Sequence, residues 1–292
     1  MRLVDDLAEP VPSGHDVVVE VRAFAINHDE ANLIARRPDG WRPGQDVAGV
    51  VVAAAGDGSG PGVGARVVCY LDWEGWAERV VVPSHCVAAL DDRVSFEQAA
   101  SLPVAGLTAL RVGGAVLGRQ VLVTGASGGV GQFAVQLAVA AGARVTAQVS
   151  RSEREAGVRA LGAHRVVTSL DADDLGPFHV VLDGIGGAQT AQAIRHMAPG
   201  GQLALYGKVA GDTSISISDF YAQGWNAHVI GFVSPVPDET KGEDLGILAE
   251  LVADGRLTPH IGLVMDWERT AEGFAALERR ETTGKIVMRI GA

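Results

Sequence analysis

The sequence is poor in cysteine, in aromatic residues and in basic residues. Cys69 and Cys86 are the only cysteines among 292 residues, and neither lies in a CxxC pair, so a four-cysteine zinc lobe and a dense disulfide framework are excluded. A single disulfide between them stays open, although sparse cysteine fits a reducing compartment. Acidic residues outnumber basic ones, 35 to 24, for a net charge of -11. This charge repels nucleic acid and anionic membranes, so neither is expected as a general partner.

Targeting and membrane segments are also missing. Residues 1–10 lack a basic stretch followed by an apolar one, which argues against a signal peptide. No apolar run approaches the roughly 20 residues that a bilayer requires. These absences predict a soluble, cytoplasmic protein. The chain is longer than one ordinary core needs, so two domains are expected.

Two regions of different pattern are present. Short strands are expected at 16–26, 46–55, 65–70 and 76–82, with a turn at 56–64. From Ser95, which has the spacing of a capping box with Gln98, β and α segments alternate. The expected strands are 120–124, 144–149, 165–168, 180–183, 201–206 and an edge strand at 227–232; the expected helices are 129–141, 152–161 and 188–197. Helices at 243–253 and 268–279 and strands near 256–264 and at 285–290 follow. Alternation of this kind predicts a parallel sheet covered by helices, hence an α/β protein.

A β-branched run at 121–124 ends in a Gly-rich turn, and a helical apolar pattern follows it. The turn matches Gly-x-Gly-x-x-Gly with Ala126 in the first position. Gly128 would allow a pyrophosphate to approach the backbone, and Gly131 would let helix and strand pack closely. The N–H groups and the positive end of the helix suit a phosphate. The predicted cofactor-binding residues here are Thr124, Ala126, Ser127, Gly128, Gly129, Val130 and Gly131.

The end of the next strand indicates which dinucleotide binds. NAD-preferring sites place a carboxylate there for the ribose 2′-hydroxyl. This chain instead has Ser150 and Arg151, with Arg154 nearby. A guanidinium can form paired, charge-assisted hydrogen bonds to a 2′-phosphate, so the sequence predicts NADPH as the cofactor. The neighbouring glutamates leave a solvated helix start as the alternative.

Residues 125–129 also match Gly-x-Ser-x-Gly, the nucleophile elbow of serine hydrolases, with Ser127 as the nucleophile. Asp183 followed by His228 or His260 has the chain order that such a triad requires. A hydrolase would leave Gly131 and the Arg151 position without a role. The dinucleotide interpretation is therefore favoured.

Six segments occur in the order seen in medium-chain dehydrogenases/reductases: Asn27, 44–51, 99–110, 121–131, 180–186 and 284–287. Over nearly its whole length the chain resembles the zinc-independent quinone oxidoreductase branch. The resemblance implies a GroES-like β-rich catalytic domain at 1–97 and 246–292. A Rossmann domain with a doubly wound parallel sheet at 98–245 would interrupt it. It also implies a homodimer paired across the edge strand at 227–232.

Zinc-using relatives place a cysteine where Asn27 stands and a His-Glu pair where Gln45 and Asp46 stand. Because Gln45 is a poor zinc ligand and the cysteine is gone, no catalytic zinc is expected. The tyrosine that often follows the family's asparagine is also missing from residues 30–33.

Without zinc, hydrogen bonds must polarise a substrate carbonyl. Asn27 and Tyr70 are the predicted catalytic residues; the alternatives are that Asn27 caps the following helix and that Tyr70 packs in the core. Further predicted cofactor contacts are Asp183, Gly207, Lys208 and Lys285, and Lys208 has a solvated loop lysine as its alternative. The predicted function is NADPH-dependent reduction of a quinone or α,β-unsaturated carbonyl. An enoyl or alkenal reductase of the same fold and a non-catalytic NADPH-binding protein are the alternatives.

Overall fold

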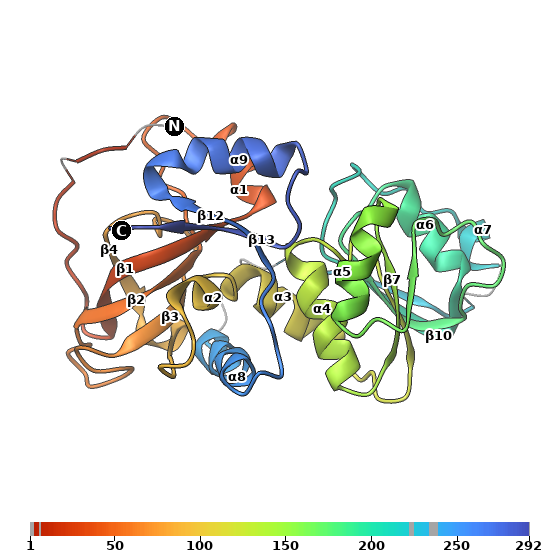
Figure 1. The fold of residues 1–292 in the computed structure, drawn as a ribbon, viewed down its shortest axis with the longest axis horizontal. Coiled ribbons are helices and arrows are strands. Elements are labelled where there is room, and N and C mark those ends of the chain that lie inside the picture. Colours follow the sequence, from red (N-terminus) through yellow and green to blue (C-terminus); the bar gives the residue numbers. More distant parts are fainter. Residues whose placement is uncertain (1–2, 6, 222–224, 234–238, 292) are drawn as a thin grey trace. The chain divides into compact units, whose positions relative to one another are not determined.

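The computed structural model describes residues 3–5, 7–221, 225–233 and 239–291 (Figure 1). The chain divides into two compact units. Unit 1 comprises residues 1–107 and 235–292, and unit 2 comprises residues 108–234. The chain thus leaves unit 1 once and returns to it. Helix α3 (Pro103–Gly113) spans the first boundary.

Within the described residues, unit 1 is built on a seven-stranded sheet in the order β12-β13-β1-β2-β3-β5, with β4 paired to β1. The strands are β1 (Asp16–Ile26), β2 (Asp46–Ala53), β3 (Arg66–Tyr70), β4 (Arg79–Pro83), β5 (Val87–Ala89), β12 (Ile261–Asp266) and β13 (Lys285–Arg289). All pairs are antiparallel except β12 with β13. The C-terminal strand β13, blue in Figure 1, lies beside the N-terminal β1. This pairing brings Lys285 next to the end of β1.

The core of unit 1 is formed by side chains that alternate along its strands. Val17, Val19 and Val21 on β1 are at most 2% exposed because alternate side chains of a strand point to the same face. Phe24 extends this face and stacks on Trp76, with ring centroids 5.3 Å apart. Each such buried side chain contributes roughly 1.5–3 kcal/mol. The helices of unit 1 are α1 (His28–Ile34), α2 (Phe96–Ala100), α8 (Lys241–Ala253) and α9 (Thr270–Glu278), with 3-10 turns η1 (Ser84–Cys86) and η3 (Trp267–Arg269).

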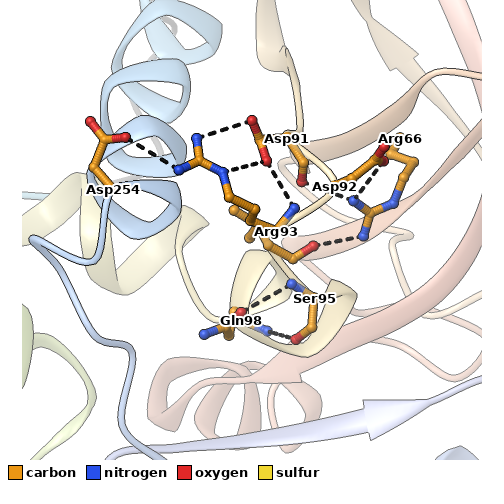
Figure 2. Close-up of polar contacts among 8 residues, drawn as sticks. Arg66, Asp91, Asp92, Arg93, Ser95, Gln98 and Asp254 are labelled. Atoms are coloured by element: carbon orange, nitrogen blue, oxygen red, sulfur yellow. Dashed lines mark hydrogen bonds and ion pairs between the residues drawn. The ribbon is translucent and has the colours of Figure 1, made fainter.

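The connection from β5 to α2 is held by polar contacts (Figure 2). Ser95 Oγ accepts from Gln98 N at 3.2 Å and Ser95 N donates to Gln98 Oε1 at 3.0 Å, so the predicted capping box is confirmed. Just before it, Arg66 Nη2 donates to the carbonyl oxygen of Val94 at 2.6 Å. The two bonds of the capping box satisfy backbone N–H groups that the start of a helix leaves without intrahelical partners.

Unit 2 contains a parallel sheet, six-stranded in the described part of the chain, in the order β11-β10-β9-β6-β7-β8. The strands are β6 (Gln120–Val123), β7 (Arg144–Gln148), β8 (Arg165–Val167), β9 (Phe178–Asp183), β10 (Met197–Leu205) and β11 (His228–Gly231). The helices are α4 (Gly129–Ala140), α5 (Glu155–Ala160), α6 (Ala188–Arg195) and α7 (Ile217–Phe220), with the 3-10 turn η2 (Ser152–Arg154). Helix α4 packs on β6 and β7.

The order of these strands is that of the Rossmann fold, in which the chain reverses direction across the sheet between its first and fourth strands. Here that switch point lies between β6 and β9. The predicted fold class, a Rossmann sheet together with a β-rich unit, is confirmed. Ligands of such sheets bind at the carboxyl ends of the strands beside the switch point.

Most predicted elements are present within a few residues, and the sequence does not signal α3, β5 and α7. Strand β5 and helix α7 are too short to show a period. Helix α3 carries Gly106 and Gly113 among apolar residues, which hides its helical pattern. Strand β11 lies at the edge of the sheet as predicted, with Val229 38% and Ile230 46% exposed. No helix among the described residues has the length and apolar character needed to cross a bilayer.

Candidate functional site

The turn after β6 is shaped by backbone contacts. Gly125 adopts a φ of +61°, which favours glycine, and its carbonyl oxygen accepts from Gly128 N at 2.9 Å. Gln148, at the end of β7, supports the turn from the adjacent strand. Its Oε1 accepts from Gly125 N at 3.2 Å, and its carbonyl oxygen accepts from Ala126 N at 2.9 Å. The sequence does not signal this supporting role of Gln148, because it depends on the pairing of β6 with β7.

Two glycines leave room at the start of α4. A Cβ on Gly131 would lie 2.3 Å from the carbonyl oxygen of Gly125 and 2.7 Å from Ala126 Cα, so helix and turn are in contact there. A Cβ on Gly128 would meet only the Gly125 oxygen, at 3.2 Å, within 4 Å. Gly129, Val130 and Gly131 form the first turn of α4, where N–H groups have no intrahelical partner. The turn therefore fits a pyrophosphate, with N–H donors and an uncrowded backbone.

Asp183, at the end of β9, is completely buried. Its Oδ1 accepts from Thr124 Oγ1 at 2.6 Å, from Ile185 N at 2.9 Å and from Gly186 N at 3.2 Å. Its Oδ2 accepts from Thr190 Oγ1 at 2.5 Å. The structure thus uses this carboxylate to join the ends of β6 and β9 and the first turns of α6. Asp183 and Thr124, both predicted as cofactor contacts, hold the strand ends in place.

The contacts of Ser127 bear on the hydrolase alternative. Ser127 is 8% exposed, and its Oγ accepts from Arg154 Nη1 at 3.4 Å. In the described part of the chain, Ser127 bonds Arg154, and Asp183 bonds two threonines and two backbone N–H groups. His228 lies exposed on β11, so these contacts assemble no Ser-His-Asp triad.

The remaining residues of unit 2 that are predicted to contact the cofactor follow β7 and β10. Ser150 and Arg151 follow β7 and are exposed. Gly207 follows β10, and a Cβ there would lie 2.3 Å from the carbonyl oxygen of Gly184, so the ends of β9 and β10 touch. Lys208 is exposed, with its Nζ 3.5 Å from Asp212 Oδ1. The predicted contacts of unit 2 thus lie at the carboxyl ends of four parallel strands, β6, β7, β9 and β10.

Unit 1 contains a buried ion pair that the sequence does not signal. Lys285 Nζ lies 2.8 Å from Asp46 Oδ2, and the two side chains are 3% and 0% exposed. Nζ also donates to Asn27 Oδ1 at 2.6 Å and, at 3.4 Å, to the carbonyl oxygen of Ile26. Asp46 Oδ1 accepts from Val104 N at 2.7 Å. Lys285 is predicted as a cofactor contact. In the structure its ammonium donates hydrogen bonds to residues of unit 1.

The ion pair fixes the orientation of the Asn27 amide. Because a lysine ammonium only donates, the atom facing Lys285 must be the amide oxygen. The amide nitrogen donates one hydrogen to Asp46 Oδ2 at 3.1 Å. The second N–H is not used in the recorded contacts of the described residues. Asn27 is half-buried, so the amide offers an N–H donor and not its carbonyl.

Glu30 lies beneath this cluster on α1. It is 0% exposed, and its Oε2 accepts from Asn27 N at 2.8 Å. Its Oε1 has no hydrogen-bond partner among the described residues. Burial, followed by the charge of Asp46, raises the pKa of Glu30 to about 8. Glu30 stands in the segment where the resemblance leads one to look for a tyrosine.

Tyr70 lies in the interior of unit 1. It is 1% exposed, its hydroxyl accepts from Gln45 Nε2 at 3.1 Å, and Lys241 Nζ lies 4.0 Å from the centre of its ring. These contacts match the alternative of a packed residue with a satisfied hydroxyl.

Comparison with known proteins places these features in a family. A family model described as zinc-binding dehydrogenase matches residues 129–249. A quinone oxidoreductase of Pongo abelii is 29% identical, over 99% of this chain and 93% of that protein. The structure of a Pseudomonas syringae pv. Tomato DC3000 quinone oxidoreductase is 26% identical with a TM-score of 0.85, covering 98% and 94% of the two chains. An NAD-dependent alcohol dehydrogenase of known structure is also 26% identical, with a TM-score of 0.85 over 98% and 95%.

The chain is a medium-chain dehydrogenase/reductase. It belongs to the quinone oxidoreductase-like branch of that superfamily, as the resemblance in its sequence predicts. Members of the branch are nicotinamide-dependent oxidoreductases, which fits the Gly-rich turn at the switch point of unit 2.

Asn27 and Asp46 stand at positions where the resemblance in sequence implies metal ligands in zinc-using relatives. Asn27 and Asp46 are in contact, and both bind the Lys285 ammonium. Among the described residues, no group of three His, Cys, Asp or Glu side chains could hold a metal ion. The Lys285 ammonium thus contacts both Asn27 and Asp46.

Proposed function

We propose that this oxidoreductase transfers hydride from NADPH to a quinone or an α,β-unsaturated carbonyl without zinc. The observation that carries the proposal is the glycine turn at the switch point, followed on the next strand by Ser150 and Arg151 in place of a carboxylate. Residues 126–131 would hold the pyrophosphate, and Arg151 the 2′-phosphate. When bound, the nicotinamide supplies the hydride.

The acceptor would be bound through Asn27. Its amide presents an N–H group, because Lys285 engages the amide oxygen. A fixed N–H donor stabilises the negative charge that develops on a carbonyl oxygen as hydride arrives. Quinones and enones suit this arrangement because hydride addition to them leaves a phenolate or an enolate, in which the charge is already delocalised.

The preference for NADPH is tested with Arg151→Ala. Removing a charge-assisted bond to the 2′-phosphate costs about 1.5–3 kcal/mol, so the Kd for NADPH should rise about ten- to hundredfold. The Kd for NADH should change little, because NADH has no 2′-phosphate. Titration of both cofactors by fluorescence measures this. Arg159→Ala, on the exposed side of α5, removes the same charge and should leave both values unchanged. Equal weakening of both cofactors by Arg151→Ala would show that Arg151 does not recognise the phosphate.

The reaction is tested with a panel of acceptors. NADPH oxidation is followed with 1,4-benzoquinone, 9,10-phenanthrenequinone and small enones, each with and without a strong zinc chelator. The proposal expects turnover of at least one acceptor and no effect of the chelator. Turnover of enones alone would identify an enoyl or alkenal reductase. Cofactor binding without any turnover would identify a non-catalytic NADPH-binding protein, and loss of activity with the chelator would contradict zinc independence.

The exposed edge strand β11 supports a further proposal, that the protein forms a homodimer through it. Open strand edges with apolar side chains pair readily with another chain. Val229 and Ile230 are both partly exposed on this edge. Light scattering at micromolar concentration should give twice the protomer mass, and Ile230→Lys should give one protomer mass. A protomer mass for the unmodified chain would contradict the proposal.

A further inference from the structure

The cluster around Asn27 contains more buried carboxylates than buried cations. Glu30 and Asp46 are both 0% exposed, and Lys285 is the ammonium that contacts the cluster in the described residues. Its N–H groups donate to Asp46, to Asn27 and to the carbonyl oxygen of Ile26. A lysine has only three N–H donors, so none is left for Glu30.

The two buried carboxylates differ in the hydrogen bonds that they accept. Asp46 accepts from the Lys285 ammonium, from the Asn27 amide and from Val104 N. Glu30 accepts from the backbone N–H of Asn27, and its other oxygen makes no hydrogen bond in the described part of the chain. The backbone groups of Asn27 and Gln45 lower the pKa of Glu30, but burial outweighs them. A buried charge without a cation is costly, and a carboxylate so placed binds a proton instead.

We propose that Glu30 is a positioning residue that acts through its proton: while neutral, it leaves Lys285 to orient the Asn27 amide, and when ionised it withdraws the ammonium from Asn27. An ionised Glu30 would need a cation, and Lys285 could pair with it only by giving up one of its present acceptors. The two uncharged acceptors, Asn27 Oδ1 and the carbonyl oxygen of Ile26, are weaker competitors than the carboxylate of Asp46, so a shift of the ammonium toward Glu30 would weaken these two contacts first. The freed amide could then rotate and lose the orientation that presents its N–H.

The groups around Glu30 support this assignment. Asp46 on β2 raises its pKa and Lys285 on β13 lowers it, after the larger effect of burial. Other charged or titratable groups around α1 are Asp29 and His28 on the helix itself, and Glu278 and Arg280 at the end of α9. Loss of solvation lowers the pKa of His28. Because burial lowers the pKa of His28 and raises that of Glu30, Glu30 is the one of these two groups that we expect to titrate above neutrality.

The first test needs neither cofactor nor substrate. The pKa of Glu30 is raised from 4.5 in the unfolded chain to about 8 in the folded one, so the folded protein binds more protons between these values. Stability should then fall as the pH rises through this window and level off above it. Thermal unfolding should show this fall in the unmodified protein and a flatter profile in Glu30→Gln. The infrared spectrum should show a protonated carboxyl band that disappears as Glu30 titrates.

The second test concerns Asn27 and rests on the proposed function. Above the pKa of Glu30, kcat should fall several-fold in the unmodified enzyme while the Kd for NADPH stays constant. Glu30→Gln, which stays neutral, should keep its kcat over the same range. His28→Gln is the matched control, and it should retain the alkaline fall.

Each outcome has a defined meaning. The proposal is overturned if Glu30→Gln and the unmodified protein share one alkaline profile in both stability and kcat. It is also overturned if the infrared band of the unmodified protein does not titrate, a measurement that does not depend on how the variant folds. If the stability profile and the band depend on Glu30 while no acceptor is reduced, the proposed function fails and the protonation of Glu30 stands.

Discussion

Replacing Gly131 with alanine is expected to abolish tight NADPH binding and to destabilise the protein. The new Cβ would lie 2.3 Å from the carbonyl oxygen of Gly125 and 2.7 Å from Ala126 Cα. Both are backbone atoms of the turn, so the turn itself must move. Overpacking of this kind costs about 1–3 kcal/mol, and a displaced turn no longer presents its N–H groups to the pyrophosphate. Thermal unfolding and NADPH titration measure the two effects.

Two other glycines provide controls for this result. Gly128→Ala introduces a milder contact, 3.2 Å from the oxygen of Gly125, so we expect near-normal stability together with weaker NADPH binding. Gly157→Ala, in α5, meets no atom within 4 Å and should leave binding unchanged and stability equal or slightly higher. If Gly131→Ala binds NADPH as well as Gly157→Ala does, the turn is not the pyrophosphate site.

The second large effect is expected when Asp46 is replaced by leucine. The change would leave the Lys285 ammonium buried at 3% exposure without its carboxylate. Removing one partner of a buried pair costs about 3–5 kcal/mol, because the other charge stays desolvated. Denaturant unfolding should show this loss. Asp212→Asn, which breaks an exposed pair with Lys208, should change stability by less than about 1 kcal/mol.

A double substitution separates the structural role of the pair from its role in the reaction. Lys285→Met combined with Asp46→Leu removes both charges, and such replacements often restore stability. Activity should not return with it, because Asn27 loses the partners of both its amide oxygen and its amide nitrogen. Recovery of both stability and kcat in the double variant would show that the orientation of Asn27 is not needed.

The features that the sequence predicts well are local ones. The turn at 125–131, the capping box at Ser95 and the strands on either side of them depend on residues close together in the chain, and all are present. The strand order, and with it the switch point, follows from alternation of β and α segments, a pattern that leaves few topologies.

The contacts that cannot be predicted from the sequence join residues that are far apart in the chain. Lys285 and Asn27 are separated by 258 residues, so no spacing rule joins them. From the sequence, Asp183 is expected to contact the cofactor. Only the structure shows that its carboxylate oxygens accept hydrogen bonds from Thr124 and Thr190. Glu30 lies in an ordinary helix start, and the charged groups that act on it, Asp46 on β2 and Lys285 on β13, come from distant parts of the chain.

The split of unit 1 into two segments has a consequence for the order of synthesis. Unit 2 is one continuous stretch, residues 108–234, whereas the sheet of unit 1 requires β13 from the later segment to pair with β1 from the earlier one. A ribosome therefore completes all of unit 2 before it adds Lys285. Until then, β1 lacks its β13 neighbour along residues 23–26 and pairs there with β2 alone, and the Asn27 amide has no ammonium to orient it.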